Sequence, residues 1–395
     1  MCKKKITCPA WAFPMILVLL LLSSFSLSAS DKPTGKFEPG SFIIEHVSDA
    51  HSWHILTYKE HDVSIPLPVI LYDDGKVICF LSSKFEHGHA AYRGYALGFT
   101  RETKGKIVKL TGKHAGYSGE LHDKEALSES VDIENMPIDF SITKNVVSLF
   151  VSIFLMIWIF LYVAKQYKNR PNKAPHGLQS FIEMIIVFVR DEIARPSIGE
   201  TRYVKYLPYL LTLFFFILLN NLMGLIPFFP GGANLTGNLA VTGILALITF
   251  ILTLCSSNKG YWKHTFNTPG APWWLKIPVP LLPTIELVGV LTKPVVLAIR
   301  LFANILGGHI IVIGIISLIF IMGQNVAPAA GYGFSIVSIF FYLFMGLLEM
   351  IVAFVQSLVF TLLSAMYIGM AREESHEDNH IETEGHSATS LSTEL

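Results

Sequence analysis

The sequence predicts an all-α polytopic membrane protein. It has five membrane spans, of which the last two are long and tilted and form a hairpin, plus an interfacial helix and a small N-terminal exported segment with β character. Of its 395 residues, 52% are hydrophobic and only 15% are charged, and the mean hydropathy is +0.50. Soluble domains carry about 25% charged residues, so this composition excludes an ordinary soluble enzyme. The formal net charge of zero argues against a nucleic-acid partner.

Residues 1–30 are predicted to be a secretory signal peptide. Three lysines at 3–5 precede the short apolar run Met15–Leu22, and the small residues Ser28–Ser30 follow it. The alternative is an uncleaved first membrane helix, but the apolar run is short for a bilayer crossing. Cleavage would leave one cysteine, Cys79, in the exported part, so no disulfide framework is expected there.

Residues 31–140 form a polar exported segment in which short strands are expected. The runs Val63–Tyr72 and Val77–Leu81 flank Asp73–Gly75, and Asp-Gly between apolar runs is a strong hairpin signal. Further strands are expected within Tyr92–Phe99 and Lys106–Leu110.

Eight of the fourteen histidines lie in this exported segment, at positions 46, 51, 54, 61, 87, 89, 114 and 122. Imidazole is a common metal ligand, so a metal site is one interpretation. A solvated, histidine-rich surface is the other, and it is favoured because no ligand spacing such as HExxH occurs. No metal and no cofactor are therefore expected.

Five long apolar stretches predict the spans of a membrane domain over residues 141–372. Val146–Ala164 has nineteen residues without a charge, enough for about 28 Å of helix. The uncharged stretch 206–258 is broken by prolines and glycines near 227–232, which divides it into two spans. The remaining spans are expected at 207–227, 238–256, Ile277–Met322 and Gly333–Met370, with an uncharged loop at Gly323–Tyr332.

The distribution of lysine and arginine predicts the orientation. Basic residues are concentrated in Lys165–Lys173 and Lys259–Lys276, and none occurs in 228–238 or 323–332. Because basic loops remain cytoplasmic, the N-terminal segment is expected outside and the acidic tail, 373–395, inside.

A charged amphipathic stretch, 176–194, is expected to be a helix at the cytoplasmic interface rather than a span. Pro196 and Gly199 are expected to end it.

The last two spans contain the ionisable residues that need a function or a compensating group at membrane depth. Helical geometry places four polar residues of the first of these spans on one stripe, Glu286, Lys293, Arg300 and Asn304. His309 lies about 180° away from Arg300. Glu349 and Gln356, seven residues apart, share a face of the other span.

Among these residues, Arg300 is the hardest to explain by a purely structural role. Its guanidinium stays charged at any relevant pH, and no carboxylate lies one helical turn away. A permanent cation of this kind suggests an acid that another subunit supplies. For Lys293, and for Glu286 near the helix end, a structural role is the competing interpretation.

Three segments carry a resemblance to a known family. The run 291–309 (LTKPVVLAIRLFANILGGH) closely resembles the signature of subunit a of the F-type ATP synthase. Asn220–Pro227 and Glu349–Gln356 are similar to two other segments of that family and occur in the same order. The similarity covers residues 140–372, and neither the exported segment nor the tail belongs to it.

The resemblance implies an ion-translocating stator subunit of a bacterial inner membrane. Arg300 would face the carboxylate of a rotor ring of c subunits and separate two half-channels, with Asn304 and Gln356 nearby. His309 and Glu349 match an acid–histidine pair of the outer half-channel. Glu286 matches an acid of the inner half-channel. Gly224 stands where some members of the family carry an aspartate.

Further partners are implied in the same way: peripheral-stalk b subunits, the other ATP synthase subunits and the lipid bilayer. No Walker A pattern occurs, so the chain is not expected to be catalytic alone. The coupling ion, H⁺ or Na⁺, stays open. Two rival functions are a secondary transporter, disfavoured because no repeated halves are seen, and a zinc-handling membrane protein.

Overall fold

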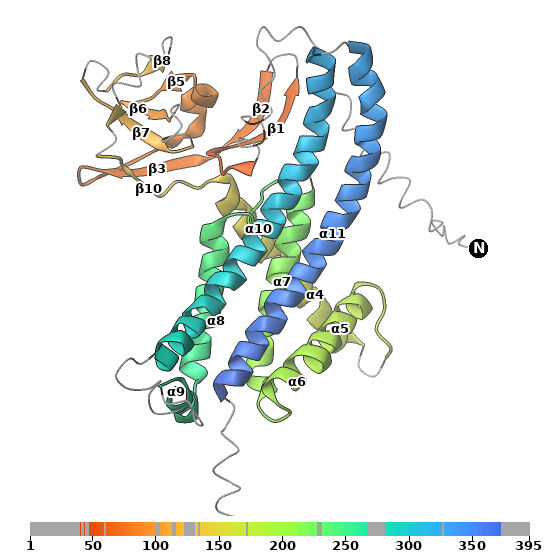
Figure 1. Ribbon diagram of the computed structural model, residues 1–395. Helices are drawn as coiled ribbons and strands as arrows, with labels where there is room; N and C mark the ends of the chain where they lie inside the picture. Colours follow the sequence, from red (N-terminus) through yellow and green to blue (C-terminus); the bar gives the residue numbers. More distant parts are fainter. Residues whose placement is uncertain are drawn as a thin grey trace, which may run out of the picture.

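The computed structural model (Figure 1) shows a helical bundle with a β-rich domain at one end. It describes residues 40–372 except for several short gaps. The residues outside the description are 1–39, 41–42, 44–46, 59–60, 99–102, 104, 113–115, 122–130, 133–134, 171–172, 227–230, 267–280, 326–327 and 373–395. The predicted signal peptide and acidic tail both lie outside the described residues.

Five helices of the described chain are long and apolar enough to span a bilayer, as predicted. They are α4 (Lys144–Asn169), α7 (Tyr203–Leu225), α8 (Leu239–Ser256), α10 (Leu281–Asn325) and α11 (Pro328–Arg372). The first three agree with the predicted spans to within a few residues, because long uninterrupted apolar runs are a local signal. A short helix, α9 (Lys259–Phe266), follows α8.

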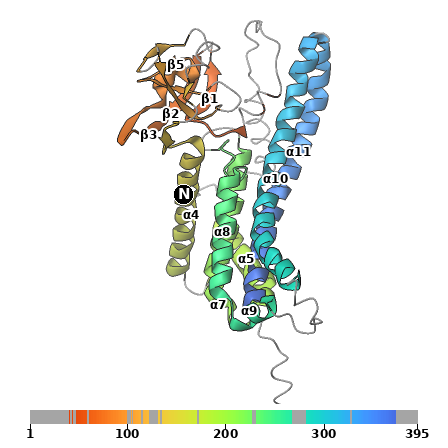
Figure 2. The same ribbon diagram turned by 60° about the vertical axis from the view of Figure 1, so that its left-hand side comes forward.

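The two longest helices, α10 and α11, lie antiparallel and side by side along their whole length (Figures 1 and 2). Of the remaining spans, α7 packs against α11, and α8 packs against α10. Leu297, Leu301 and Phe360 are fully buried where this hairpin meets α7 and α8. The predicted long hairpin is therefore confirmed.

The loop expected at Gly323–Tyr332 is wrong, because most of it is helical. α10 continues to Asn325, and α11 already begins at Pro328. Two glycines explain the tight connection: a Cβ atom on Gly331 would lie 3.0 Å from the Cα of Gly323. Without side chains at these positions the two backbones approach closely enough for the helices to continue almost to the turn.

A segment lying across the end of the bundle matches the predicted interfacial helix. It consists of α5 (Leu178–Phe188), the π-helical turn η3 (Val189–Ala194) and α6 (Arg195–Ile198). The expectation that Pro196 ends the helix is wrong, since proline is tolerated in the first turn of α6. The helix ends at Gly199, whose φ of 98° suits glycine.

Hydrogen bonds between side chains join the middle helices. The hydroxyl group of Tyr206 donates to Ser256 over 2.9 Å, and the hydroxyl oxygens of Tyr209 and Thr249 lie 2.7 Å apart. Such bonds connect transmembrane helices where lipid offers no competing partner.

The β-rich domain, from Ser52 to Asp139, consists of small antiparallel sheets. Its strands are β1 (Ser52–Tyr58), β2 (His61–Pro66), β3 (Pro68–Asp73), β4 (Lys76–Leu81), β5 (Ala90–Ala91), β6 (Tyr95–Leu97), β7 (Ile107–Leu110), β8 (Gly119–Glu120), β9 (Val131–Asp132) and β10 (Ile138–Asp139), with the 3₁₀ turn η1 at Ser82–Gly88. The pairing orders are β1-β2, β10-β3-β4, β5-β8 and β6-β7-β9.

The expected hairpin is confirmed at its turn. Asp73 pairs with Lys76, and Asp74 and Gly75 have φ values of 47° and 77°, as a tight two-residue turn requires. The single strand expected over Val63–Tyr72 is wrong, because it divides at Leu67 into β2 and β3. Prolines 66 and 68 have no N–H to continue a ladder, and the Leu67 N–H donates to the Ser82 hydroxyl over 3.0 Å.

Candidate functional site

The candidate site lies along the α10–α11 hairpin, and Arg300 is its most unusual residue. Arg300 is exposed on α10, while Leu297 and Leu301 on the same helix turn toward the bundle and are buried. Its neighbours on the outer surface are apolar, among them Val296 and Ile299. Among the residues that the structure describes, no carboxylate lies within ion-pair distance of its guanidinium.

The polar stripe predicted on α10 is exposed along most of its length. Glu286, Arg300 and Asn304 are exposed, and Lys293 is half-buried. The Lys293 ammonium lies 5.6 Å from the centre of the Tyr367 ring, a cation–π contact with α11. Lys293 thus has a structural partner, whereas Arg300 presents its charge outward.

Two of the predicted residues, Asn304 and Gln356, meet across the hairpin. The side-chain amide of Asn304 donates to the carbonyl oxygen of Gln356 over 2.9 Å. Gln356 is 3% exposed, and Asn304 lies at the surface one turn after Arg300. The bond therefore fixes a polar group of α11 beside the arginine.

His309 and Glu349 also meet across the α10–α11 hairpin, further along α10 than Asn304. The histidine Nδ1 lies 3.4 Å from the Glu349 Oε1, and their side chains are 16% and 7% exposed. A carboxylate and an imidazole in such a setting can exchange a proton without leaving the protein interior.

Two glycines surround this acid–histidine pair. A Cβ atom on Gly224 of α7 would lie 3.4 Å from the His309 Nε2, and one on Gly308 would lie 3.0 Å from the Glu349 Oε1. Gly224 of α7 is therefore next to the pair. The space beside Gly308 was missed by sequence reasoning, since it depends on the opposing helix.

Glu286 lies far from this pair, near the start of α10. Its charge, together with burial, raises the pKa of Tyr261 in α9 above the usual value of 10.0, burial being the larger cause. Glu286 belongs to the end of α10 that packs against α9.

Sequence reasoning also missed a buried polar contact that connects α7 to α11. The Asn221 amide donates to the Ala353 carbonyl over 3.2 Å, and the Thr236 hydroxyl donates to the Asn221 side-chain oxygen over 2.6 Å. The paired asparagines 220 and 221 inside an apolar span were the available signal.

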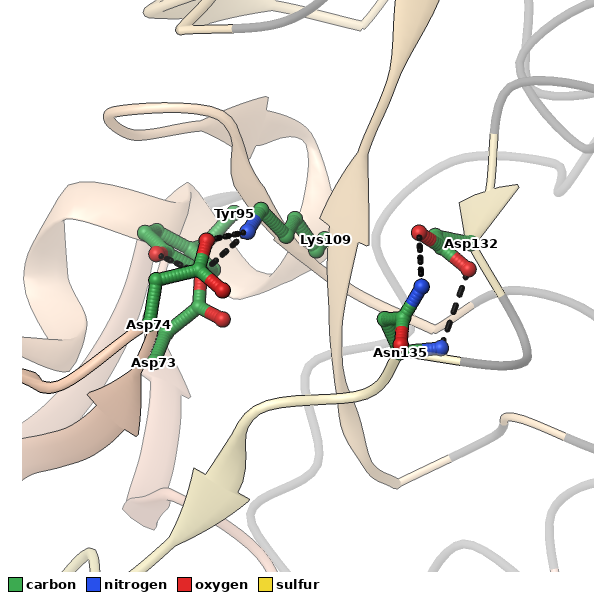
Figure 3. A network of polar contacts seen from close by, with 6 residues as sticks. All are labelled: Asp73, Asp74, Tyr95, Lys109, Asp132 and Asn135. Atoms are coloured by element: carbon green, nitrogen blue, oxygen red, sulfur yellow. Dashed lines mark hydrogen bonds and ion pairs between the residues drawn. The ribbon is translucent and has the colours of Figure 1, made fainter.

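The β-rich domain contains its own charged cluster (Figure 3). Lys109 lies 2.6 Å from a carboxylate oxygen of Asp73 and 2.8 Å from one of Asp74, and the Tyr95 hydroxyl donates to Asp73 over 2.7 Å. No group of three or more potential metal ligands is found among the described residues. The histidines at 46, 114 and 122 lie outside the described residues.

In comparisons with known proteins, the membrane domain and the segment before it match two different family models. The family model described as "ATP synthase A chain" matches residues 146–369, and one described as a domain of unknown function (DUF8433) matches residues 42–140.

Individual relatives agree with the first match. "ATP synthase subunit a" of Chlorobium phaeobacteroides (strain DSM 266) is 38% identical over 303 residues, covering 74% of this chain and 83% of that protein. "ATP synthase subunit a 2" of Prosthecochloris aestuarii is 36% identical over 324 residues, covering 79% and 93%. "ATP synthase subunit a" of Myxococcus xanthus is 40% identical over 252 residues, covering 62% and 77%.

Proposed function

Since the chain belongs to the ATP synthase subunit a family, we propose that Arg300 faces the carboxylates of a rotor ring and separates two half-channels. The protein is a non-catalytic membrane subunit of the complex and belongs to its proton-translocating sector. The observation that carries the proposal is an exposed arginine on an apolar helix surface, with no ion pair in the described part of the chain.

The cost of the arginine supports a functional role. A charge at the bilayer centre costs about 3 kcal/mol on insertion scales. An acid on a neighbouring subunit would offset this cost, and Arg300 would favour the ionised form of that acid as it passes. The same positive charge opposes direct passage of a cation along the surface of α10.

Proton-carrying groups on either side of Arg300 along α10 support two separate half-channels. Glu286 precedes Arg300 by fourteen residues and His309 follows it by nine, so they lie about 21 Å and 14 Å from it along the helix axis. We assign Glu286 to the cytoplasmic half-channel and the His309–Glu349 pair to the outer one. Asn304 and Gln356 support the arginine at the boundary between them.

The assembly proposed for the chain follows from this role. The partners are a ring of c subunits against the exposed face of α10 and α11, peripheral-stalk b subunits, the other synthase subunits and the lipid bilayer. In a bacterial inner membrane, the segment 31–140 would be periplasmic after removal of 1–30, and the tail 373–395 would be cytoplasmic.

The decisive experiment measures ATP synthesis and passive proton leak in vesicles that contain the assembled complex. Arg300→Ala should abolish coupled synthesis while leak through the membrane sector persists or rises. Arg300→Lys should also fail, because ammonium lacks the planar, weakly hydrated guanidinium fork. The matched control is Lys293→Met, which removes a cation already packed on Tyr367 and should retain most activity. Near wild-type synthesis by Arg300→Ala would overturn the proposal.

The proposed orientation has a separate test. Ser83 in the β-rich domain and Lys173 after α4 are both exposed, and the proposal puts them on opposite sides of the membrane, so each is replaced by a single cysteine. An impermeant maleimide added to intact cells with permeabilised outer membranes should label Ser83→Cys and spare Lys173→Cys. The opposite labelling pattern would exchange the two half-channel assignments.

A further inference from the structure

The sheet β10-β3-β4 is apolar on both faces, although only one of them is covered by residues that the structure describes. Its inner face carries Val69 and Leu71, both fully buried against Phe85 and the β6–β7 sheet. The residues that alternate with them point the other way. The outward positions of β3, β4 and the end of β10 are Pro68, Ile70, Tyr72, Val77, Cys79, Leu81, Ile138 and Phe140.

This outward face, here called the apolar sheet face, is exposed and uncharged. Val77 is 65% exposed and Phe140 is 64% exposed, and Tyr72, Leu81 and Ile138 are exposed too. Tyr72 is the direct neighbour of Val77 on one side and of Ile138 on the other, so these side chains form a continuous row. Contiguous exposed apolar surface of this kind marks an interaction site.

The charges of the hairpin are kept away from this face. Asp73 and Asp74 are both held by Lys109 of β7, on the side of the domain core. Asp139 alternates with Ile138 and Phe140, and its carboxylate lies 2.8 Å from the His51 ring instead. The carboxylates of Asp73, Asp74 and Asp139 are thereby paired with Lys109 or His51 and not with groups on the apolar sheet face.

Hydrogen bonds fix the apolar sheet face to the start of the first membrane helix. The Phe140 N–H donates to the Ile70 carbonyl and the Ile142 N–H to the Pro68 carbonyl, so the sheet leads directly toward α4. The Lys144 N–H donates to the Ala50 carbonyl. Only six residues separate Lys144 from the exposed Phe150, about 9 Å along the helix. The sheet is therefore attached next to the start of the apolar part of α4.

The hairpin also extends sideways, over the space around the helices. In both Figure 1 and Figure 2 the β3–β4 hairpin projects beyond α4 and α8, close to the level at which α4 begins. The strands β6 and β7, which pack on the inner face, lie on the side away from the helices. The opposite face is thus on the side of the domain nearer the helices.

We propose that the apolar sheet face lies on the lipid bilayer and inserts its aliphatic and aromatic side chains into the interfacial region of the leaflet where α4 begins. Tyrosine and phenylalanine at this depth are typical of interfacial anchoring. The contact would hold the β-rich domain in a fixed orientation over the bundle. It does not depend on the role of Arg300 or on which side of the membrane the domain occupies.

The test uses the assembled complex in nanodiscs with an environment-sensitive fluorophore on single cysteines. One variant keeps the native Cys79 as the label site and replaces Cys2, Cys8 and Cys255 with alanine. A second carries Val77→Cys in a cysteine-free chain. The control is Ser83→Cys, an exposed position on η1 in the same domain.

Spin-labelled lipids should quench the fluorophore at Cys79 and at Val77→Cys several-fold more than at Ser83→Cys, with a blue-shifted emission at the first two. Labels near the headgroup end of the acyl chain should quench better than labels deep in the chain. A blue shift without lipid quenching would show that a protein covers the face, and overturns the proposal. Red-shifted emission with equal quenching at all three sites would show a solvent-exposed face, and overturns it as well.

Discussion

Lys109 of the β-rich domain and Arg300 of the α10–α11 hairpin differ in whether the described chain itself supplies a carboxylate partner. Lys109 lies within 2.8 Å of two carboxylates and needs no further partner. Arg300, in a far less polar setting, has no ion pair within the described residues. A charge costs more in the membrane than at a protein surface, so the absent partner is more informative there. The difference separates charges that hold the fold together from charges reserved for another subunit.

The same contrast holds for the acids. Hydrogen bonds from Lys109 and Tyr95 lower the pKa of Asp73 below 3.8 even though burial opposes them. Glu349 has the His309 ring at 3.4 Å, an arrangement with room for a proton to move between the two groups. Asp73 is thus held in its ionised form by its partners, whereas Glu349 lies beside a group that can take or give a proton.

The largest effect in this comparison should come from the acid–histidine pair. His309→Ala or Glu349→Ala should slow proton-driven ATP synthesis by more than about tenfold, because the outer half-channel loses a proton-carrying group. The exchange of His309→Glu with Glu349→His should recover part of the rate. Synthesis in vesicles is the measurement, and full activity of either single mutant would show that the pair only fills space.

A smaller effect should follow from breaking the bond between Asn304 and Gln356. Gln356→Leu removes the acceptor, and a net loss of about 1 kcal/mol in positioning corresponds to roughly a fivefold slower synthesis. Ser364→Ala is the matched control, since this buried hydroxyl bonds only the backbone of its own helix. If the two variants were equally active, the contact would not support the arginine.

The smallest effect on synthesis should come from the charged cluster of the β-rich domain. Lys109→Met should destabilise the domain by about 1 kcal/mol, because the pair lies near the surface, while ATP synthesis stays near wild type. Hydrogen exchange of residues 68–110 in the intact complex measures the loss. If Lys109→Met stopped ATP synthesis without accelerating hydrogen exchange, the distinction between structural charges and charges that act on another subunit would be wrong.

The stability that this cluster gives to the β-rich domain should be lost at both alkaline and acidic pH, through different groups. Burial and the bond to Asp73 raise the pKa of Tyr95 to about 12, above its usual value of 10.0. Its stabilisation is therefore complete below pH 10 and is lost as pH rises toward 12. The contribution of Asp73, whose pKa is lowered, is present above pH 3.8 and is lost as the pH falls below that value. Tyr95→Phe should reduce the alkaline loss in hydrogen exchange, the rest of which comes from Lys109, whose pKa is raised by its bonds to Asp73 and Asp74. It should leave most of the acidic loss, since Lys109 still bonds Asp73.

Features that depend on neighbouring residues in the chain were predictable from the sequence. The five spans follow from uninterrupted apolar runs, and the Asp74–Gly75 turn follows from the positive φ values that those residues accept. Arg300 stood out for a local reason too, because no acid lies one turn away on its helix.

Features that depend on distant segments needed the tertiary structure. β10 pairs with β3, about 66 residues earlier in the chain, and no pattern within either strand identifies that pairing. The expected loop at 323–332 became helix because Gly331 approaches Gly323 of the other helix.

The candidate site also has features that follow from local periodicity and features that follow from tertiary packing. Periodicity placed Glu286, Arg300 and Asn304 on one stripe, since a helix repeats every 3.6 residues whatever surrounds it. The resemblance already implied the His309–Glu349 pair, but only packing between α10, α11 and α7 decided that Gly224 and Gly308 lie next to it. The rotation of one helix against another depends on how all their side chains interlock.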